Sequence, residues 1–112
     1  MMRSTSYRLL RGGEILRVAT ECYESGAQLF SRHYLQRERE RIFDRGHLAQ
    51  LLKSKSTVGE LTRPIPKQFD GYKAYNYELS GKAGGRRFVV WFHVLEVGGG
   101  PFVIWGPGAW RD

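Results

Sequence analysis

The stretch YKAYNYEL, residues 72–79, decides the fold because its side chains alternate in character along the chain. One side of an extended backbone would carry Lys73, Tyr75, Tyr77 and Leu79. Period-two alternation with several aromatic residues is typical of a β-strand. The sequence therefore predicts a strand over Tyr72–Leu79.

Downstream of this strand, glycine-rich turns separate further β-rich runs. Gly81–Gly85 forms the first turn and Arg86–Val97 the next long run, then Gly98–Pro101 turns again before a last strand at Phe102–Trp105. Short connections favour antiparallel pairing of consecutive strands. We expect an antiparallel meander of three to four strands.

Upstream of the strands the apolar residues follow a helical period. The first such stripe consists of Ile15, Val18, Ala19, Cys22 and Tyr23. This spacing predicts an amphipathic helix from Gly13 that stops at Gly26.

Two more helices are expected before the sheet. Ser31 is a good N-cap residue, and a second helix should run from it to about Arg45, with Gly46 closing it. His47–Lys53 carries leucines at helical spacing and predicts a short third helix.

The remaining segments predict loops or short extended pieces. Ser54–Thr57 and Pro64–Ile65–Pro66 should form a loop, because proline interrupts both helices and β-ladders. Met1–Arg11 suits a short arm, an opening strand or a turn of helix. The expected fold class is α+β: one domain over residues 1–112, with about three N-terminal helices packed on one face of the antiparallel sheet.

Charge and cysteine content indicate which binding partners and which cellular location to expect. Eighteen Lys and Arg against eleven Asp and Glu give a formal charge of +7, which favours a polyanion such as RNA or an acidic protein. The single cysteine, Cys22, cannot form an internal disulfide, so we expect a reducing, cytoplasmic location. The longest apolar run, Phe88–Phe92, is far too short to cross a membrane, and no membrane partner is expected.

A basic stripe on the predicted second helix is the first candidate site. His33, Arg37, Arg41 and Arg45 are spaced four residues apart, which places them along one side of a helix. Guanidinium groups in a row can hold phosphates by paired hydrogen bonds. The alternative is an ordinary solvated surface, with the stripe neutralised by the neighbouring acids Glu38, Glu40 and Asp44.

The predicted sheet offers a second set of candidates. Lys73, Tyr75 and Tyr77 share one side of their strand, and Arg86 and Arg87 begin the next strand. Basic and aromatic side chains interleaved on a sheet can hold a nucleic-acid backbone and stack its bases. The same pattern also suits a hairpin whose tyrosines cover the core.

His93 is a separate candidate within the long run. Period two places it on the same side as Val89, Trp91 and Leu95. It would be catalytic if that side opened into a cleft shared with Arg87 or the tyrosines, and otherwise a half-buried structural residue.

Motifs of other chemistries do not occur in the sequence. It contains no paired-cysteine spacing, no His-Glu-x-x-His, no phosphate loop ending in Gly-Lys-Ser/Thr and no Gly-x-Ser-x-Gly turn. Three scattered histidines and one cysteine do not predict a metal site. We expect no cofactor.

The run Ser31-Arg32-His33, the arginines that follow it, the short leucine helix and the meander together resemble a known group. They are similar to the RelE-like and barnase/colicin-type small ribonuclease toxins of bacteria, over about Ser31–Trp105. Gly106–Asp112 has no counterpart in that pattern. The resemblance implies an endoribonuclease of a toxin–antitoxin or immunity system, from a bacterium or phage, that cleaves RNA without metal through attack of the ribose 2′-OH on the adjacent phosphate.

The resemblance also implies roles for particular residues. His33 would act as base or acid while Arg37 and Arg41 hold the phosphate, and the sheet would complete the catalytic site with Lys73, Tyr75, Arg87 or His93. The residues expected to bind nucleic acid are Arg32, Arg45, Tyr77 and Arg86. An acidic antitoxin or immunity protein would be the cognate partner. The alternative is a nonenzymatic regulator, of phage or host, that binds nucleic acid or protein through the basic helix.

Overall fold

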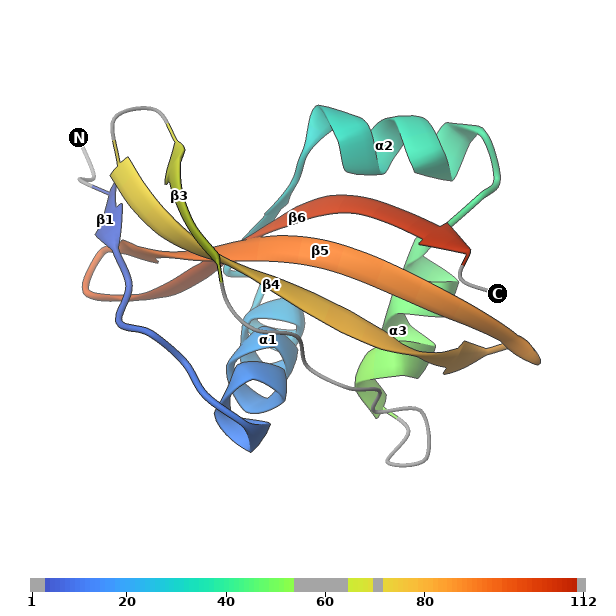
Figure 1. Ribbon diagram of the computed structural model, residues 1–112, viewed down its shortest axis with the longest axis horizontal. Coiled ribbons are helices and arrows are strands. Elements are labelled where there is room, and N and C mark those ends of the chain that lie inside the picture. The colour runs from blue at the N-terminus through green and yellow to red at the C-terminus, as the bar shows by residue number, and fades with distance from the viewer. Residues whose placement is uncertain (1–3, 54–64, 70–71, 111–112) are drawn as a thin grey trace.

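The computed structural model describes residues 4–53, 65–69 and 72–110, and six strands within them form one mixed sheet. The strands are β1 (Ser4–Ser6), β2 (Gln28–Phe30), β3 (Ile65–Phe69), β4 (Tyr72–Ala83), β5 (Arg86–Val97) and β6 (Gly100–Trp110). Their order is β2-β6-β5-β4-β3, and β1 pairs with the end of β5 (Figure 1). The predicted α+β class and the β4–β5–β6 antiparallel meander are confirmed.

The sheet differs from the expected one in its outer strands. β2 pairs with β6 in parallel, with Phe30 opposite Trp105, so the sheet is mixed and has more strands than expected. β3 includes Ile65 and Pro66, which the sequence assigned to a loop. β3 is the last strand in the order, and an edge strand tolerates proline because one side of its backbone needs no ladder bond.

The three helices are α1 (Gly13–Ser25), α2 (Arg32–Arg39) and α3 (Arg45–Lys53). α1 and the start of α2 agree with the sequence. Gly26 ends α1 in the left-handed conformation, with φ 83°, and its N–H donates to Cys22 O. Ser31 caps α2, since its hydroxyl accepts a hydrogen bond from Tyr34 N at 3.2 Å. None of the helices in the described ranges is long and apolar enough to span a membrane.

The predicted second helix is wrong in its extent, because the chain leaves the helix after Arg39. Arg41 adopts φ 58°, its N–H donates to Glu38 O, and the N–H of Ile42 donates to Arg37 O. This pair of bonds is the Schellman ending of a helix, which normally uses glycine where Arg41 stands. The basic stripe is therefore divided between α2, a turn and α3.

α3 begins two residues earlier than expected, and Gly46 lies inside it rather than closing α2. Asp44 caps α3: its Oδ1 accepts from His47 N at 2.9 Å, and its own N–H donates to His47 Nδ1 at 3.2 Å. The imidazole of His47 also stacks on Phe88 of β5, with 4.4 Å between ring centroids.

The main core lies between one face of the sheet and the helices α1 and α3. The sheet contributes Tyr77, Leu79, Ala83, Phe88, Val90, Phe92, Val94, Val103 and Trp105, and the helices contribute Ile15, Val18, Ala19, Cys22, Leu48, Leu51 and Leu52, with Tyr34 from α2. Phe43, between α2 and α3, packs directly on the backbone of Gly108, where a Cβ atom would overlap its ring. α2 lies beside β6 at the edge of the sheet rather than on this face (Figure 1).

Candidate functional site

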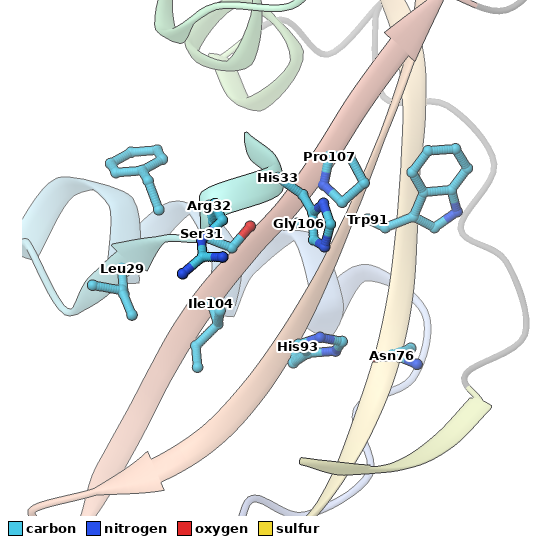
Figure 2. Close-up of a pocket in the computed structure, with 11 residues that line it drawn as sticks. Leu29, Ser31, Arg32, His33, Asn76, Trp91, His93, Ile104, Gly106 and Pro107 are labelled. Carbon is cyan, nitrogen blue, oxygen red and sulfur yellow. The ribbon is translucent and has the colours of Figure 1, made fainter. Parts of the chain in front are cut away.

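A pocket of about 710 Å³ lies on the face of the sheet that turns away from the main core. The end of β2 and the start of α2 contribute Leu29, Phe30, Ser31, Arg32 and His33 to its lining, and the sheet contributes Asn76, Trp91, His93, Ile104, Gly106 and Pro107. Figure 2 shows the two histidines between Leu29 and Arg32 on one side and Trp91 and Asn76 on the other. Six of the eleven lining residues are apolar and five are polar, and this mixture of apolar surface with several polar groups is usual for a ligand pocket.

Strand alternation accounts for the sheet side of the pocket. Asn76 of β4 is directly opposite His93 of β5, and Glu78 is directly opposite Trp91. The residues between them, such as Tyr77 and Phe92, point into the main core. The polar side chains of both strands therefore share the pocket face.

The parallel pairing of β2 with β6 accounts for the other side. Ser31 N donates to Trp105 O at 3.0 Å, which holds the start of α2 against β6. Arg32 and His33 occupy the first helical turn, whose amides an α-helix leaves unbonded. This arrangement brings His33 and His93, which are far apart in the chain, to one pocket.

A β-bulge in β6 shapes the wall next to Trp91. Val90 pairs with Gly108 and Phe92 pairs with Trp105, so β6 contains one more residue than β5 between these pairs. A Cβ atom on Gly106 would lie 2.9 Å from the carbonyl oxygen of Trp91. Glycine at this position lets the bulge approach β5 closely.

Trp91 is held by one hydrogen bond at its polar edge. Its Nε1 donates to Glu78 Oε2 at 3.0 Å, and 38% of the residue is still exposed. The bond fixes the rotation of the indole while part of the ring surface faces the pocket.

Among the residues proposed from the sequence, His33, His93 and Arg32 line this pocket together. His93 lines a cleft, which was the condition set for a catalytic role. The residue of the preceding strand that shares this cleft is Asn76 and not a tyrosine. Arg32 and His33 are exposed at the rim, and His93 is half-buried.

The other proposed catalytic residues whose side chains are described do not line it. Arg37 and Arg41 are exposed, the first on α2 and the second in the turn after it. Arg87 is exposed at the β4–β5 hairpin end of the sheet. Lys73 pairs with Gln68 through the backbone of β4, and its side chain lies outside the described part of the structure.

The tyrosines expected to face a ligand lie on the core side instead. Tyr77 is 2% exposed, and its hydroxyl accepts a hydrogen bond from Leu10 N at 2.9 Å. Burial raises the pKa of Tyr77, so its phenol stays protonated at neutral pH. Tyr75 is half-buried and packs against the same core. Their aromatic surface stabilises the fold, which excludes Tyr77 as a stacking residue for nucleic acid.

Two of the proposed nucleic-acid-binding arginines contact aromatic rings. The guanidinium of Arg45 lies 4.2 Å from the ring centroid of Phe30, and its Nε lies 3.4 Å from Glu38 Oε2. Arg86 lies 4.1 Å from the ring centroid of Trp110. In contrast, Arg32, Arg37, Arg39 and Arg41 form no ion pair with any residue that the structure describes.

The sequence interpretation missed Asn76, Trp91 and the bulge at Gly106 and Pro107. Alternation placed Asn76 and Glu78 on one side of their strand, but the candidate residues were chosen from the other side, which carries the tyrosines. Trp91 was placed with His93 but given no role. The bulge needs the register of β6 against β5, which no local pattern contains.

Comparison with known proteins adds no family to these observations: the chain matches no family model, and it matches no curated protein and no solved structure.

Proposed function

We propose that the protein is a metal-independent endoribonuclease and that the pocket is its active site. The observation that carries the proposal is the convergence of two imidazoles and a guanidinium, those of His33, His93 and Arg32, on one pocket of a strongly basic protein. A base, an acid and a cation are the groups that transfer of a phosphoryl group within RNA requires.

The two histidines exchange protons with the RNA. The neutral imidazole takes the proton of a ribose 2′-OH as that oxygen attacks the adjacent phosphorus. The P–O5′ bond then breaks, and the second histidine, in its protonated form, gives its proton to the leaving 5′-oxygen. The products are a 2′,3′-cyclic phosphate and a 5′-hydroxyl, and reopening of the cyclic phosphate by water would restore both protonation states.

Arg32 and the start of α2 stabilise the negative charge that develops on the phosphorus-bound oxygens. The Arg32 side chain lines the pocket and forms no ion pair with a described residue. The first-turn amides of Arg32 and His33 add N–H donors at the positive end of the helix dipole. These donors do not have to reorganise when the charge forms.

The test compares cleavage of single-stranded RNA in EDTA by the wild type and by His33→Ala, His93→Ala and Arg32→Ala. Each histidine variant should cleave about 10²–10⁴-fold more slowly, the usual contribution of a positioned acid or base. Arg39→Ala is the matched control, because it removes the same charge from α2 at a residue that does not line the pocket. Full activity of both histidine variants in folded protein would refute the assignment.

Cellular consequences follow from the same proposal. The enzyme would act on cytoplasmic RNA, arrest growth when expressed, and require an acidic antitoxin or immunity protein. Expression of His33→Ala and His93→Ala should be tolerated where the wild type arrests growth.

A nonenzymatic role is the second candidate, favoured by the arginines of α2 and its following turn that lie outside the pocket. Arg37, Arg39 and Arg41 are exposed and form no ion pair with described residues, so they are available to bind phosphates. Binding of RNA without cleavage, lost in the Arg37→Ala plus Arg41→Ala variant, would establish this role instead.

A further inference from the structure

The pocket combines an aromatic surface with a side-chain amide whose oxygen accepts no hydrogen bond from the described residues. Trp91 belongs to β5, a central strand of the sheet. A tryptophan at such a position normally buries most of its ring surface. Here 38% of the residue is exposed, and it lines the pocket with its Nε1 already bonded to Glu78. The ring is therefore oriented before any ligand arrives.

Asn76 supplies the amide on the neighbouring strand. Its Oδ1 is buried and accepts no hydrogen bond from any residue that the structure describes. A buried acceptor without a donor destabilises a protein, and such a group in a pocket indicates a ligand that supplies the donor. The side-chain amide presents one acceptor and one donor side by side, which matches the hydrogen-bonding edge of a nucleobase.

We propose that the pocket binds one unpaired base of single-stranded RNA, stacked on the indole of Trp91 with its edge against the amide of Asn76. This inference rests on the proposed ribonuclease function and specifies its substrate. Trp91 and His93 are two residues apart on the same face of β5, about 7 Å along the strand. A base on Trp91 therefore keeps its own ribose and phosphate beside the imidazole.

The same geometry excludes double-stranded RNA from the pocket. In a duplex both faces of a base are stacked and its pairing edge is occupied, so neither Trp91 nor Asn76 could reach it. Every base has a ring face, and every base has a donor next to an acceptor on one edge. The site therefore selects unpaired bases as a class more strongly than it selects one base.

The experiment measures the contribution of a single base to binding. The probes are two trinucleotides of 2′-O-methyl RNA, whose blocked 2′-oxygen cannot attack phosphorus: one with a base only at its central position and one with no base. Wild type should bind the first roughly 5- to 150-fold more tightly, the range expected for stacking of one base. Trp91→Ala should bind both equally, with its affinity for the baseless trinucleotide unchanged.

Three further variants make the result specific. Trp91→Phe should keep part of the increment because a phenyl ring still stacks, and Asn76→Ala should lose part of it. Trp110→Ala is the matched control: Trp110 is 51% exposed but pairs with Phe88 on the core side of the sheet and does not line the pocket. It should keep the full increment. Thermal unfolding confirms that each variant is folded.

The outcomes separate the two proposals. Equal binding of both trinucleotides by the wild type, or an increment that survives in Trp91→Ala, overturns the base site even if the protein cleaves RNA. A base increment that depends on Trp91, in a protein that cleaves no RNA, supports the base site and refutes the ribonuclease assignment.

Discussion

Trp105 and Trp91 lie on opposite faces of the sheet, and in both the indole N–H donates to a side chain on a neighbouring strand. Trp105 donates to Gln28 Oε1 at 2.7 Å and is fully buried in the main core. Trp91 bonds Glu78 at 3.0 Å and faces the pocket. The same residue with the same kind of anchor thus serves the core on one face and an open site on the other. Coverage by helices makes the difference.

The first prediction uses this pair, and its expected effect is the largest. Trp105→Ala should lower the free energy of unfolding by about 3–5 kcal/mol, because it removes a large side chain from a closed core. Trp91→Ala should lower it by about 1 kcal/mol or less, because much of its ring is already hydrated. Chemical denaturation of both variants measures the difference. Equal losses would mean that the two faces are equally closed and that the pocket is part of the core.

The comparison extends to β4, where the side that the sequence interpretation assigned to a ligand faces the core. Tyr75 and Tyr77 fitted the pattern of a nucleic-acid-binding surface, but aromatic residues on one side of a strand also make a good core face. The helices α1 and α3 cover that side, which leaves Asn76 and Glu78 toward the pocket side. Alternation sorts residues into two sides without saying which side is covered.

The second prediction tests the core assignment of Tyr77. Tyr77→Phe keeps the ring but removes the hydroxyl that accepts from Leu10 N, so a buried backbone N–H loses its partner. The free energy of unfolding should fall by about 1–3 kcal/mol. Tyr7→Phe, at a half-buried tyrosine in the segment before α1, is the control and should change it little. Unaltered stability of Tyr77→Phe would show that the buried hydrogen bond contributes nothing.

Elements with strong local patterns were predictable, and those set by distant contacts were not. The stripe beginning at Ile15 and the alternation around Tyr77 placed α1 and β4 correctly. β2 is three residues long and exists because β6 pairs with it. Pro66 is in a strand only because that strand is the edge of the sheet.

Dependence on contacts between distant parts of the chain also limited the prediction of the site. His33 and His93 were each found by residue type and position, but their meeting depends on the parallel pairing of β2 with β6. Asn76 acquires its significance only as the residue opposite His93. The break of the basic stripe at Arg41 was hidden because arginine rarely takes the backbone conformation found there.

The third prediction concerns that break and has the smallest effect. Arg41→Gly should raise the free energy of unfolding by about 1 kcal/mol, because glycine adopts a positive φ without strain. Arg39→Gly, at the last residue of α2, should lower it by about the same amount because glycine is a poor helix residue. Denaturation midpoints of the two variants would then shift in opposite directions. A loss of stability in Arg41→Gly would mean that the arginine side chain contributes more than its backbone strain costs.

The parallel pairing of β2 with β6 also determines when the site can exist during synthesis. α2 is held at the pocket through Ser31 and Trp105, and Trp105 is made after both His33 and His93. A chain still emerging from the ribosome carries His33 and His93 without the strand that brings them together. Pairing across so long a stretch of chain also forms slowly, since the loop must close before the contact stabilises it. The pocket is therefore not assembled until β6 has been made, and an enzyme of the proposed kind would not act on the RNA that encodes it before then.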